Sequence, residues 1–412
     1  MGTRGDVQPY AVLGQALAER GHDVILSTAK NFEELIVGYG LKFHPVDVDY
    51  EEILNSKEGR KILQVNIFAI QRNLDKHIYP LIKKSLNEFY KLAQTSDLVI
   101  YRPKTMADVF TQQLNVKAIS AAVIPAMEET AAFFNPMFSS LNLPSFLNRW
   151  SYKLNKFRYS LLHTPINEFR IQNGLHSHKI NNVNVPCIYG ISPSFLERPP
   201  DWPKDQYLTG FWFPKNTSIV DQDTLDFVEN GKPPILVTFG SMPFKKDISS
   251  LINYAVQQLD ERFIIVKGWG NWNDSNLISD RIKIVPTTNF EALFPKVKAI
   301  IHHGGIGTIA ECLRAGKPML ICPVLFPVGD HSFWADLVYK RGLGVKPVPL
   351  SRISADVFVE KIRELVSDEQ LYINAAAMAE KINAENGLQK AVEIIENICV
   401  DQRELQLTRL LH

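Results

Sequence analysis

The sequence predicts an α/β protein built from two parallel-sheet halves. Short, β-branched apolar runs alternate with stretches of helical periodicity along most of the chain. A segment rich in proline and turn residues, 193–234, separates an earlier alternation from a later one. The length of 412 residues also suits two domains. Two such halves leave a cleft between them, which is a usual place for a ligand.

The first half is predicted to begin with a helix. Apolar residues recur at helical spacing over residues 8–20, and Gly21 follows as a suitable stop. A glycine-containing loop such as 2–5 normally follows a strand of a parallel sheet, so either this half lacks its first strand or its sheet begins differently from expectation. The strands predicted for it are 23–28, 98–101, 118–124 and 187–191.

The second half repeats the alternation after the proline-rich segment. Its predicted strands are 235–239, 263–267, 282–285, 299–302 and 319–324. Its predicted helices lie near 247–260, 290–295, 306–315, 331–341, 354–366 and 368–384. A last amphipathic stretch runs from about residue 388 to 399.

Composition excludes several classes of protein. A formal net charge of +1 provides no bulk argument for nucleic-acid binding. The four cysteines show neither disulfide nor metal spacing, which favours a reducing compartment. No apolar run reaches the length of about 18 residues that a membrane span requires, and no signal peptide opens the chain. We therefore expect a cytoplasmic location.

The most informative stretch is the block of two histidines and three glycines at 302–307. A β-branched run leads into it and a helix follows, so the glycines let the backbone approach a ligand at the positive end of a helix dipole. His303 can donate to a phosphate oxygen, and Thr308 adds a hydroxyl at the helix start. Glu311 lies one turn further and can accept two ribose hydroxyls. The block predicts a diphosphate site; a glycine turn with a capping threonine is the structural alternative.

A dinucleotide site is a competing interpretation of the same block. Residues 305–310 fit the pattern G-x-G-x-x-A, and Asp330 lies about twenty residues further on, where a ribose-binding acid belongs. Against it, Asp330 follows two prolines in a loop and three predicted strands precede the block. That interpretation also provides no role for His303 or Glu311. His302 and His303 have no third ligand at metal spacing, so zinc is not expected.

Four further features have both a structural and a functional interpretation. Asp6 is a natural helix cap or a general base that faces the cleft. Ser241 ends a tight turn or contacts phosphate. Asp330 caps the next helix or holds sugar hydroxyls. The aromatic stretch 126–163 packs inward or forms an apolar wall, and the two are weighted equally.

These motifs together resemble one family over nearly the whole chain. The segments 2–9, 201–211, 289–308 and 330–345 are similar to motifs of the GT-B-fold, nucleotide-sugar-dependent glycosyltransferases. The resemblance is to sterol glucosyltransferases, glycopeptide-antibiotic glycosyltransferases and the rhamnosyltransferases of glycolipid synthesis. It implies two Rossmann-like domains that face each other across a cleft. Two departures are the absent first strand and Asp330-His331, which stands where the family usually has Asp-Gln.

The resemblance implies a role for each candidate residue. Asp6 would be the catalytic base. The other implied sites are the donor diphosphate (Ser241, His303, Gly305, Gly307, Thr308), the nucleoside (Val285, Phe290, Glu311), the donor sugar (Asp330, His331) and the acceptor pocket (Phe133, Phe134, Phe138). Residues 1–213 would form the acceptor-binding domain and 214–387 the nucleotide-sugar domain. Residues 388–412 would form a helix that packs back on the first domain.

The implied activity is inverting transfer of a sugar from a UDP- or dTDP-sugar to a hydroxyl of an apolar acceptor. The acceptor would be a sterol, a glycolipid or a natural product. No metal or other cofactor is expected, and the nucleotide sugar acts as co-substrate. Nucleic acid is not an expected partner, peripheral membrane contact is compatible with the sequence, and the oligomeric state stays open. The alternatives are a nucleotide-sugar epimerase or hydrolase on the same fold, and a non-catalytic protein that binds sugar nucleotides or lipids.

Overall fold

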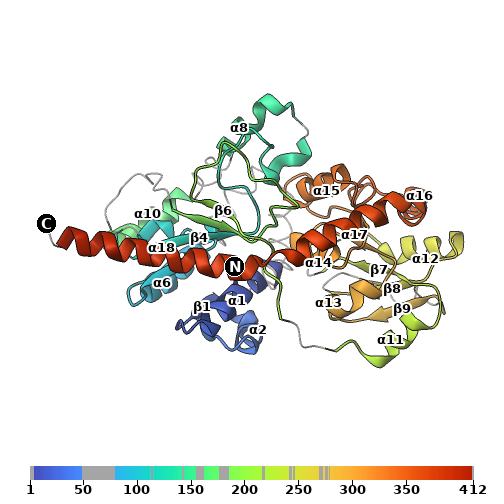
Figure 1. Cartoon of the computed structure of the whole chain (residues 1–412), viewed down its shortest axis with the longest axis horizontal. Helices are drawn as coiled ribbons and strands as arrows, with labels where there is room; N and C mark the ends of the chain where they lie inside the picture. Colours follow the sequence, from blue (N-terminus) through green and yellow to red (C-terminus); the bar gives the residue numbers. More distant parts are fainter. Residues whose placement is uncertain are drawn as a thin grey trace. The chain divides into compact units, whose positions relative to one another are not determined.

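The computed structural model of the chain divides into two compact units. Unit 1 comprises Met1–Ala132, Phe146–Pro214 and Asn386–His412, and unit 2 comprises Phe133–Ser145 and Lys215–Glu385. Both units are α/β (Figure 1). The structure describes residues 4–48, 79–111, 113–114, 116–141, 143–154, 162–175, 185–215, 219–240, 244, 246–268, 272–273, 277 and 279–410.

Unit 1 contains two separate parallel sheets. The larger has the order β3-β4-β5-β6, and the smaller pairs β1 with β2. The strands are β1 (Ile25–Ala29), β2 (Lys42–Val46), β3 (Leu98–Tyr101), β4 (Lys117–Ala122), β5 (Cys187–Tyr189) and β6 (Gln206–Leu208). The helices are α1 (Arg4–Glu19), η1 (Lys30–Phe32), α2 (Glu33–Gly38), α6 (Tyr79–Ala93), η3 (Pro103–Thr105), α7 (Asp108–Thr111), α8 (Asn148–Ser151), α10 (His163–Gln172) and α18 (Gly387–Leu410).

The first described element is α1, which starts four residues earlier than its periodicity indicated. Pro9 therefore lies inside the helix and not in its first turn. Val12 and Leu13 of α1 are buried in the core of the unit. The expectation that this half lacks its first strand stays a prediction, because the described residues begin with α1 itself, at Arg4.

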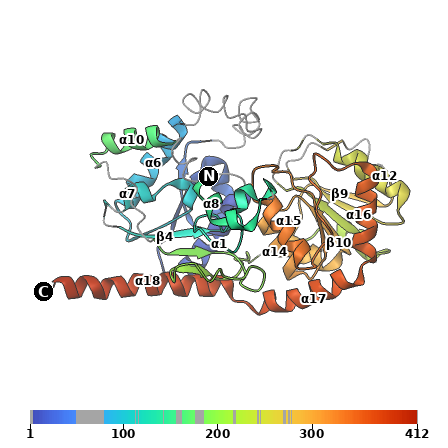
Figure 2. The same cartoon turned by 90° about the horizontal axis from the view of Figure 1, so that it is seen from above.

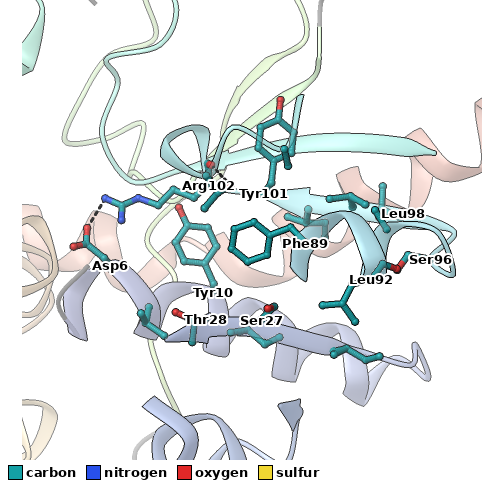
Figure 3. A pocket seen from close by; sticks show the side chains of 18 residues that line it. Asp6, Tyr10, Ser27, Thr28, Phe89, Leu92, Ser96, Leu98, Tyr101 and Arg102 are labelled. Carbon is teal, nitrogen blue, oxygen red and sulfur yellow. Dashed lines mark hydrogen bonds and ion pairs between the residues drawn. The ribbon is translucent and has the colours of Figure 1, made fainter. Parts of the chain in front are cut away.

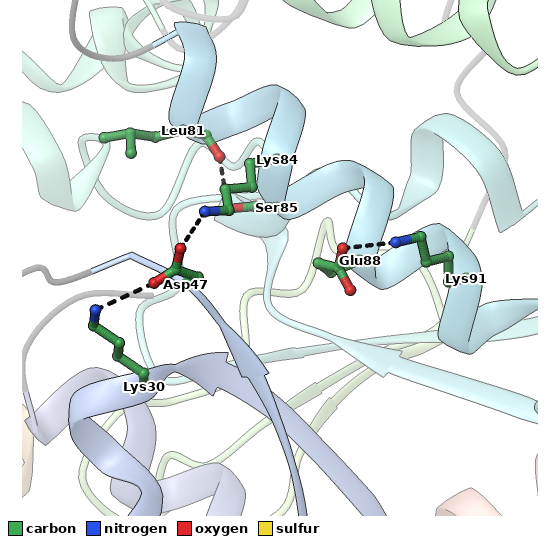
Figure 4. A network of polar contacts seen from close by, with 7 residues as sticks. All are labelled: Lys30, Asp47, Leu81, Lys84, Ser85, Glu88 and Lys91. Atoms are coloured by element: carbon green, nitrogen blue, oxygen red, sulfur yellow. Dashed lines mark hydrogen bonds and ion pairs between the residues drawn. The ribbon is translucent and has the colours of Figure 1, made fainter.

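The pair β1–β2 is linked to α6 by side chains. Asp47, next to β2, pairs with Lys30 at 3.2 Å and also with Lys84 of α6 (Figure 4). His44 of β2 lies 3.1 Å from Glu88 of α6, which also binds Lys91 of the same helix. Ion pairs as exposed as those of Asp47 contribute little to stability. These contacts therefore position the strands β1 and β2 beside α6 more than they stabilise them.

The long helix α18 packs on unit 1. Its Ala391, Val392 and Ile395 are buried in the same core as Val12 and Trp212. Glu396 receives a hydrogen bond from Arg20 of the first helix region at 2.6 Å. The approach is close at its start, where a Cβ on Gly387 would lie 2.5 Å from the carbonyl carbon of Gly210.

Unit 2 is built on one five-stranded parallel sheet with the order β11-β10-β7-β8-β9. The strands are β7 (Ile235–Thr238), β8 (Phe263–Val266), β9 (Ile282–Val285), β10 (Ala299–His302) and β11 (Met319–Ile321). The helices are η4 (Pro136–Leu141), α11 (Gln222–Glu229), α12 (Ile248–Gln258), α13 (Phe290–Leu293), η7 (Phe294–Lys296), α14 (Ile306–Arg314), α15 (His331–Lys340), α16 (Ala355–Ser367) and α17 (Glu369–Ala384). The short helix η5 (Ser145–Leu147) crosses the boundary, with its last two residues in unit 1.

Helices pack in pairs around this sheet. α12 contacts α16, and α14 contacts α17 (Figure 2). The strands of the sheet centre are apolar on both faces, as covered parallel strands require, and β7, β8 and β10 are fully buried.

Residues Phe133–Ser145 pack with unit 2, although they belong to the first half of the sequence. Gly329 donates its backbone N–H to the carbonyl of Met137 at 2.9 Å, and Ser140 donates to the carbonyl of Pro327. The ring of Phe133 lies 5.2 Å from that of Phe333. The boundary expected at residue 213 therefore places this segment in the first domain, whereas it packs with the second. The contacts that hold it there join residues far apart in the sequence, so sequence patterns do not indicate them.

We predict that Gly387→Ala destabilises the protein. The added Cβ would meet backbone atoms of Gly210 and Phe211 at 2.5–2.6 Å, so α18 must shift, at a cost of about 1–3 kcal/mol. Gly38→Ala is the matched control, because a Cβ there meets nothing within 4 Å. Urea unfolding measures both; equal midpoints for the two variants would contradict the close docking of α18.

Candidate functional site

The candidate site in unit 2 lies where the carboxyl ends of β7, β8 and β10 meet. In the sheet order, the chain proceeds from β7 to β8 and β9 on one side and then to β10 and β11 on the other. Ligands of open α/β sheets bind outside the carboxyl ends of the strands at such a switch point. Thr238 and His302 are in register at the ends of β7 and β10, so the loops that follow them start side by side.

Glycines surround the ring of His303 in this corner. A Cβ on Gly240 would lie 3.2 Å from Cε1 of His303, and one on Gly305 would lie 2.5 Å from Nε2. A Cβ on Gly268 would meet the carbonyl oxygen of Gly240 at 2.2 Å. Gly240 and Gly268 also have positive φ angles, 57° and 55°. The loops after β7, β8 and β10 can converge only because these positions carry no side chain.

The helix α14 begins in this corner, as the sequence predicts. Gly305 is its N-cap and supplies no side-chain hydrogen bond to the first turn. Gly307 faces open space, and Thr308 is half-buried beside it. The first-turn N–H groups and the helix dipole together favour an anion here.

His303 is neutral in this setting. Burial, with a smaller contribution from His331, holds its pKa well below the usual value. Nδ1 of His303 is buried without a hydrogen-bond partner. A neutral imidazole offers one N–H donor and one acceptor, so this ring can still donate to an anionic oxygen. The neighbouring His302 differs, because its Nδ1 accepts the N–H of Gly304 at 3.2 Å.

Glu311, on the second turn of α14, belongs to a charge network that the sequence did not indicate. Oε2 of Glu311 accepts two hydrogen bonds from Arg314, at 3.0 and 2.6 Å. Arg314 also reaches Glu291 at 3.3 Å. Burial raises the pKa of Glu311, and Arg314 partly offsets that rise. The i, i+3 spacing of Glu311 and Arg314 was the available signal for this pair.

Asp330 and His331 point into the protein. Oδ2 of Asp330 accepts the indole N–H of Trp334 at 2.9 Å, and the side chain does not cap α15. The capping interpretation of Asp330 is therefore wrong, because the indole holds its carboxylate. His331 is 4% exposed; its Nδ1 accepts the N–H of Leu325 at 3.2 Å, and its ring lies 5.0 Å from that of His303.

Two of the three predicted nucleoside residues lie at the end of β9 and the start of α13, and the third, Glu311, lies on α14. Val285 is the buried last residue of β9. Phe290 is the first residue of α13, and the side chain of Asn289 caps this helix. The ring of Phe290 stacks on that of Phe294, with 4.6 Å between their centroids. Ser241 lies outside the described residues.

Asp6, in unit 1, is in the first turn of α1 and pairs with Arg102 (Figure 3). The side chain of Arg102 is 8% exposed and that of Asp6 is 27% exposed, so the pair is half-shielded with the carboxylate on the outer side. Arg102 follows the carboxyl end of β3, a position at which a charged residue is itself a signal. Arg102 was not among the residues predicted from the sequence.

The three acceptor-pocket phenylalanines lie in or beside η4 of unit 2. Phe133 packs on Phe333, and Phe134 and Phe138 are half-buried. Their predicted role stays a prediction, but their place is in unit 2 and not in the first domain.

The described part of the chain offers neither a cluster of metal ligands nor a membrane-spanning helix. It holds no group of three or more histidine, cysteine, aspartate or glutamate side chains arranged for a metal ion. Among the described helices, none has the length and apolarity to cross a membrane.

Two family descriptions match the chain. Residues 1–124 match the glycosyltransferase family 28 N-terminal domain, and residues 250–398 match the erythromycin biosynthesis protein CIII-like C-terminal domain. The chain belongs to the GT-B-fold glycosyltransferases. The site built on β7, β10 and α14 therefore lies in the half of a glycosyltransferase that contains the second match.

Curated relatives of this glycosyltransferase include enzymes of two kinds. It is 29% identical to O-mycaminosyltylonolide 6-deoxyallosyltransferase of Streptomyces fradiae, over 96% of this chain and 95% of the relative. It is 30% identical to sterol 3-beta-glucosyltransferase of Yarrowia lipolytica, over 96% of this chain and 28% of that longer protein.

Solved structures share the fold of the glycosyltransferase. Glycosyltransferase VinC in complex with dTDP aligns with a TM-score of 0.66 and 17% identity, over 97% of this chain and 98% of that one. The glycosyltransferase of kitacinnamycin aligns with a TM-score of 0.68 and 14% identity, over 96% of each chain.

We predict that buried, neutral His302 makes the protein less stable in mild acid. The pKa of His302 in the folded protein lies well below the unfolded value of about 6.5. When the pH decreases through 6.5, only the unfolded chain gains a proton, so the free energy of unfolding decreases. Between pH 7.5 and 5.5 the protonation of this residue in the unfolded chain lowers the free energy of unfolding by about 1 kcal/mol. Urea unfolding should show that much less pH dependence in His302→Phe. Ile301→Val, a non-titrating core change, should keep the wild-type dependence; equal dependence in all three proteins would contradict the neutral histidine.

Proposed function

We propose that this glycosyltransferase moves a sugar from a UDP- or dTDP-sugar to a hydroxyl of an apolar acceptor, with inversion at the anomeric carbon. One observation carries the proposal. At the switch point of unit 2, the uncapped N-terminus of α14 and the neutral His303 share a corner that glycines keep open. This corner provides positive dipole and hydrogen-bond donors without a side chain in the way.

The donor diphosphate would bind at the first turn of α14. Backbone N–H groups near Gly305 and Gly307, the hydroxyl of Thr308 and one N–H of His303 would meet its oxygens. When the bond from the anomeric carbon to the diphosphate oxygen breaks, the leaving group keeps the electron pair. Dipoles that are already oriented stabilise that charge without reorganisation.

Acceptor activation is assigned to Asp6. The acceptor oxygen attacks the anomeric carbon on the face opposite the diphosphate, and its proton passes to the carboxylate. A carboxylate is a weak base, but the hydroxyl becomes acidic as its oxygen bonds to carbon. Arg102 would hold Asp6 in position by pairing with it.

Nucleoside and sugar contacts complete the proposed donor site. Glu311, oriented by Arg314 through Oε2, would accept ribose hydroxyls, and Val285 and Phe290 would border the base. Asp330 and His331 would lie by the donor sugar. Relatives use different sugars, since one is a 6-deoxyallosyltransferase and another a glucosyltransferase. The donor sugar is therefore left open in this proposal.

The acceptor proposed is a sterol or a macrolide-type natural product, the two kinds named for its relatives. Phe134 and Phe138 are the candidates for its apolar wall. The reaction is proposed to need neither metal nor organic cofactor, because α14 and His303 would take the role of a cation. A cytoplasmic location is proposed with it.

One experiment separates transfer from the alternative functions. Incubation with a panel of UDP- and dTDP-sugars, with and without a sterol or macrolide alcohol, should release nucleoside diphosphate only when acceptor is present. Release without acceptor would indicate a hydrolase, and binding without release a silent binding protein. Proton NMR of the glycoside then reads the anomeric configuration, and a retained configuration would overturn the inverting mechanism.

We predict that Asp6→Asn lowers the transfer rate by about 10²–10⁴-fold and leaves donor affinity unchanged. Asparagine keeps the shape and can still accept from Arg102, but it cannot take the proton. Initial rates and calorimetry with UDP or dTDP measure the two effects. Asp23→Asn, an exposed carboxylate paired with Lys42 in the same unit, is the control. Normal turnover by Asp6→Asn would remove Asp6 as the base.

We predict that His303→Ala and Gly305→Ala each weaken nucleoside diphosphate binding by about tenfold or more. The first change removes a donor, and the second places a Cβ 2.5 Å from Nε2 of the ring. The two effects should not add, because the double variant has no ring to displace. Calorimetry on the three variants checks this; full additivity would show that the glycine does not act through His303.

A further inference from the structure

One short helical segment of unit 1 turns its aromatic face toward water. The helix η5 runs directly into α8, and Leu147 at the junction keeps a right-handed helical backbone (α8 in Figure 1). Phe146 and Trp150 are four residues apart, so they share one face of this segment. Phe146 is 81% exposed and Trp150 is 48% exposed. A surface helix normally buries its apolar face, so the usual pattern is inverted here.

Polar contacts hold the opposite face of the same segment. Asn148 is buried, and its side-chain amide donates to the carbonyl of Ala131 at 2.8 Å. Arg149 donates to Asp201 at 2.9 Å, and Asp201 also accepts the hydroxyl of Thr130 at 2.6 Å. The hydrogen bond from Thr130, more than the other contacts, holds the pKa of the Asp201 carboxyl well below its usual range. The segment is therefore anchored through its polar side, which leaves the aromatic side outward.

The chain around this face has positive but no negative side chains. Residues 130–167 include no aspartate or glutamate, although the whole chain has 44. The same stretch contains Arg149, Lys153, Lys156 and Arg158, of which the last two lie outside the described residues. Lys153 is exposed three residues after Trp150, and no described residue forms an ion pair with it. The aromatic face is therefore bordered by an unneutralised cation.

These features favour a lipid surface over a protein partner. A stable protein interface takes about 20–30 residues a side, whereas this face presents two exposed aromatic rings. A symmetric contact with a second copy would also place the same positive stretch against itself. At a membrane, each inserted ring contributes without a large complementary surface, and lysine is attracted to anionic headgroups. Tryptophan is enriched at the headgroup level.

We propose that the face formed by Phe146, Trp150 and Lys153 binds the surface of a membrane that contains anionic lipids. The ring of Phe146, which is the more exposed, would enter the boundary of the acyl chains. The indole of Trp150 would lie at headgroup level, and Lys153 would pair with an anionic headgroup. Arg149 would stay with Asp201 and keep the segment in place. Attachment would be peripheral and reversible, and the proposal does not depend on the proposed function.

Vesicle sedimentation with the full chain tests the binding. The protein should sediment more with vesicles of phosphatidylcholine and phosphatidylserine than with phosphatidylcholine alone, and added salt should reduce the difference. Phe146→Ser should weaken partitioning by about tenfold. Lys153→Gln should weaken it by about fivefold, and only with the anionic vesicles.

The matched control removes an exposed apolar side chain elsewhere. Ile373, on α17 of unit 2, is 60% exposed, so Ile373→Ser should bind vesicles as the wild type does. Thermal midpoints of all variants should stay close to the wild type, because the substituted side chains are exposed. If Phe146→Ser binds as tightly as the wild type and Ile373→Ser, the proposal is wrong.

A fluorescence experiment locates the contact on the chain. Vesicles with brominated acyl chains quench tryptophans that reach the lipid, and the chain has six tryptophans. Trp150→Phe keeps an aromatic ring, so this variant should still sediment with vesicles but lose most of the quenching. Undiminished quenching in Trp150→Phe would show that another surface meets the membrane and would contradict the assignment.

Sedimentation velocity without lipid addresses the other occupant. The wild type and Phe146→Ser should have the same state of association. Self-association of the wild type that Phe146→Ser abolishes would make this face an interface between copies, and the membrane assignment would fall.

Discussion

Unit 2 depends on a steric constraint, the contact of an imidazole ring with backbone that carries no side chains. His303 follows the last residue of β10, Gly240 after β7 lies against its ring, and Gly268 after β8 packs in turn on the backbone of Gly240. A methyl group on Gly268 or Gly305 would overlap existing atoms. The same absence of side chains leaves the first turn of α14 open toward solvent. The close packing around His303 and the open access to the N-terminus of α14 therefore have the same cause, the glycines in these loops.

Burial in this corner also determines its charge. His302 and His303 stay neutral because desolvation disfavours the imidazolium form, and a charge on the neighbouring His331 would oppose a charge on either ring. The positive potential that an anion meets here therefore comes from the helix dipole and from N–H groups, not from a cationic side chain. Glu311 carries its negative charge beside Arg314, one to two turns away from the helix start.

Unit 1 is organised around an interrupted sheet. β1 and β2 form a pair of their own, and side chains of α1 and α6 line a cavity between that pair and β3. The ion pair of Asp6 and Arg102 lies at the end of this space. The position of the proposed base and the order of the sheet are thus linked, since both depend on how α1 packs against β3.

The sequence by itself determined the alternation of strands and helices and the start of α14 at the glycine block. These are local properties, since side-chain periodicity and glycine spacing act over a few residues. Only the tertiary structure decided that Gly240 lies against His303 and Gly268 against Gly240. It also decided that Arg102 pairs with Asp6 and that Phe133–Ser145 packs on α15. It also decided that Trp334 holds Asp330. Each of these is a contact between residues brought together by folding or by a side-chain rotamer, and one sequence contains no record of such contacts.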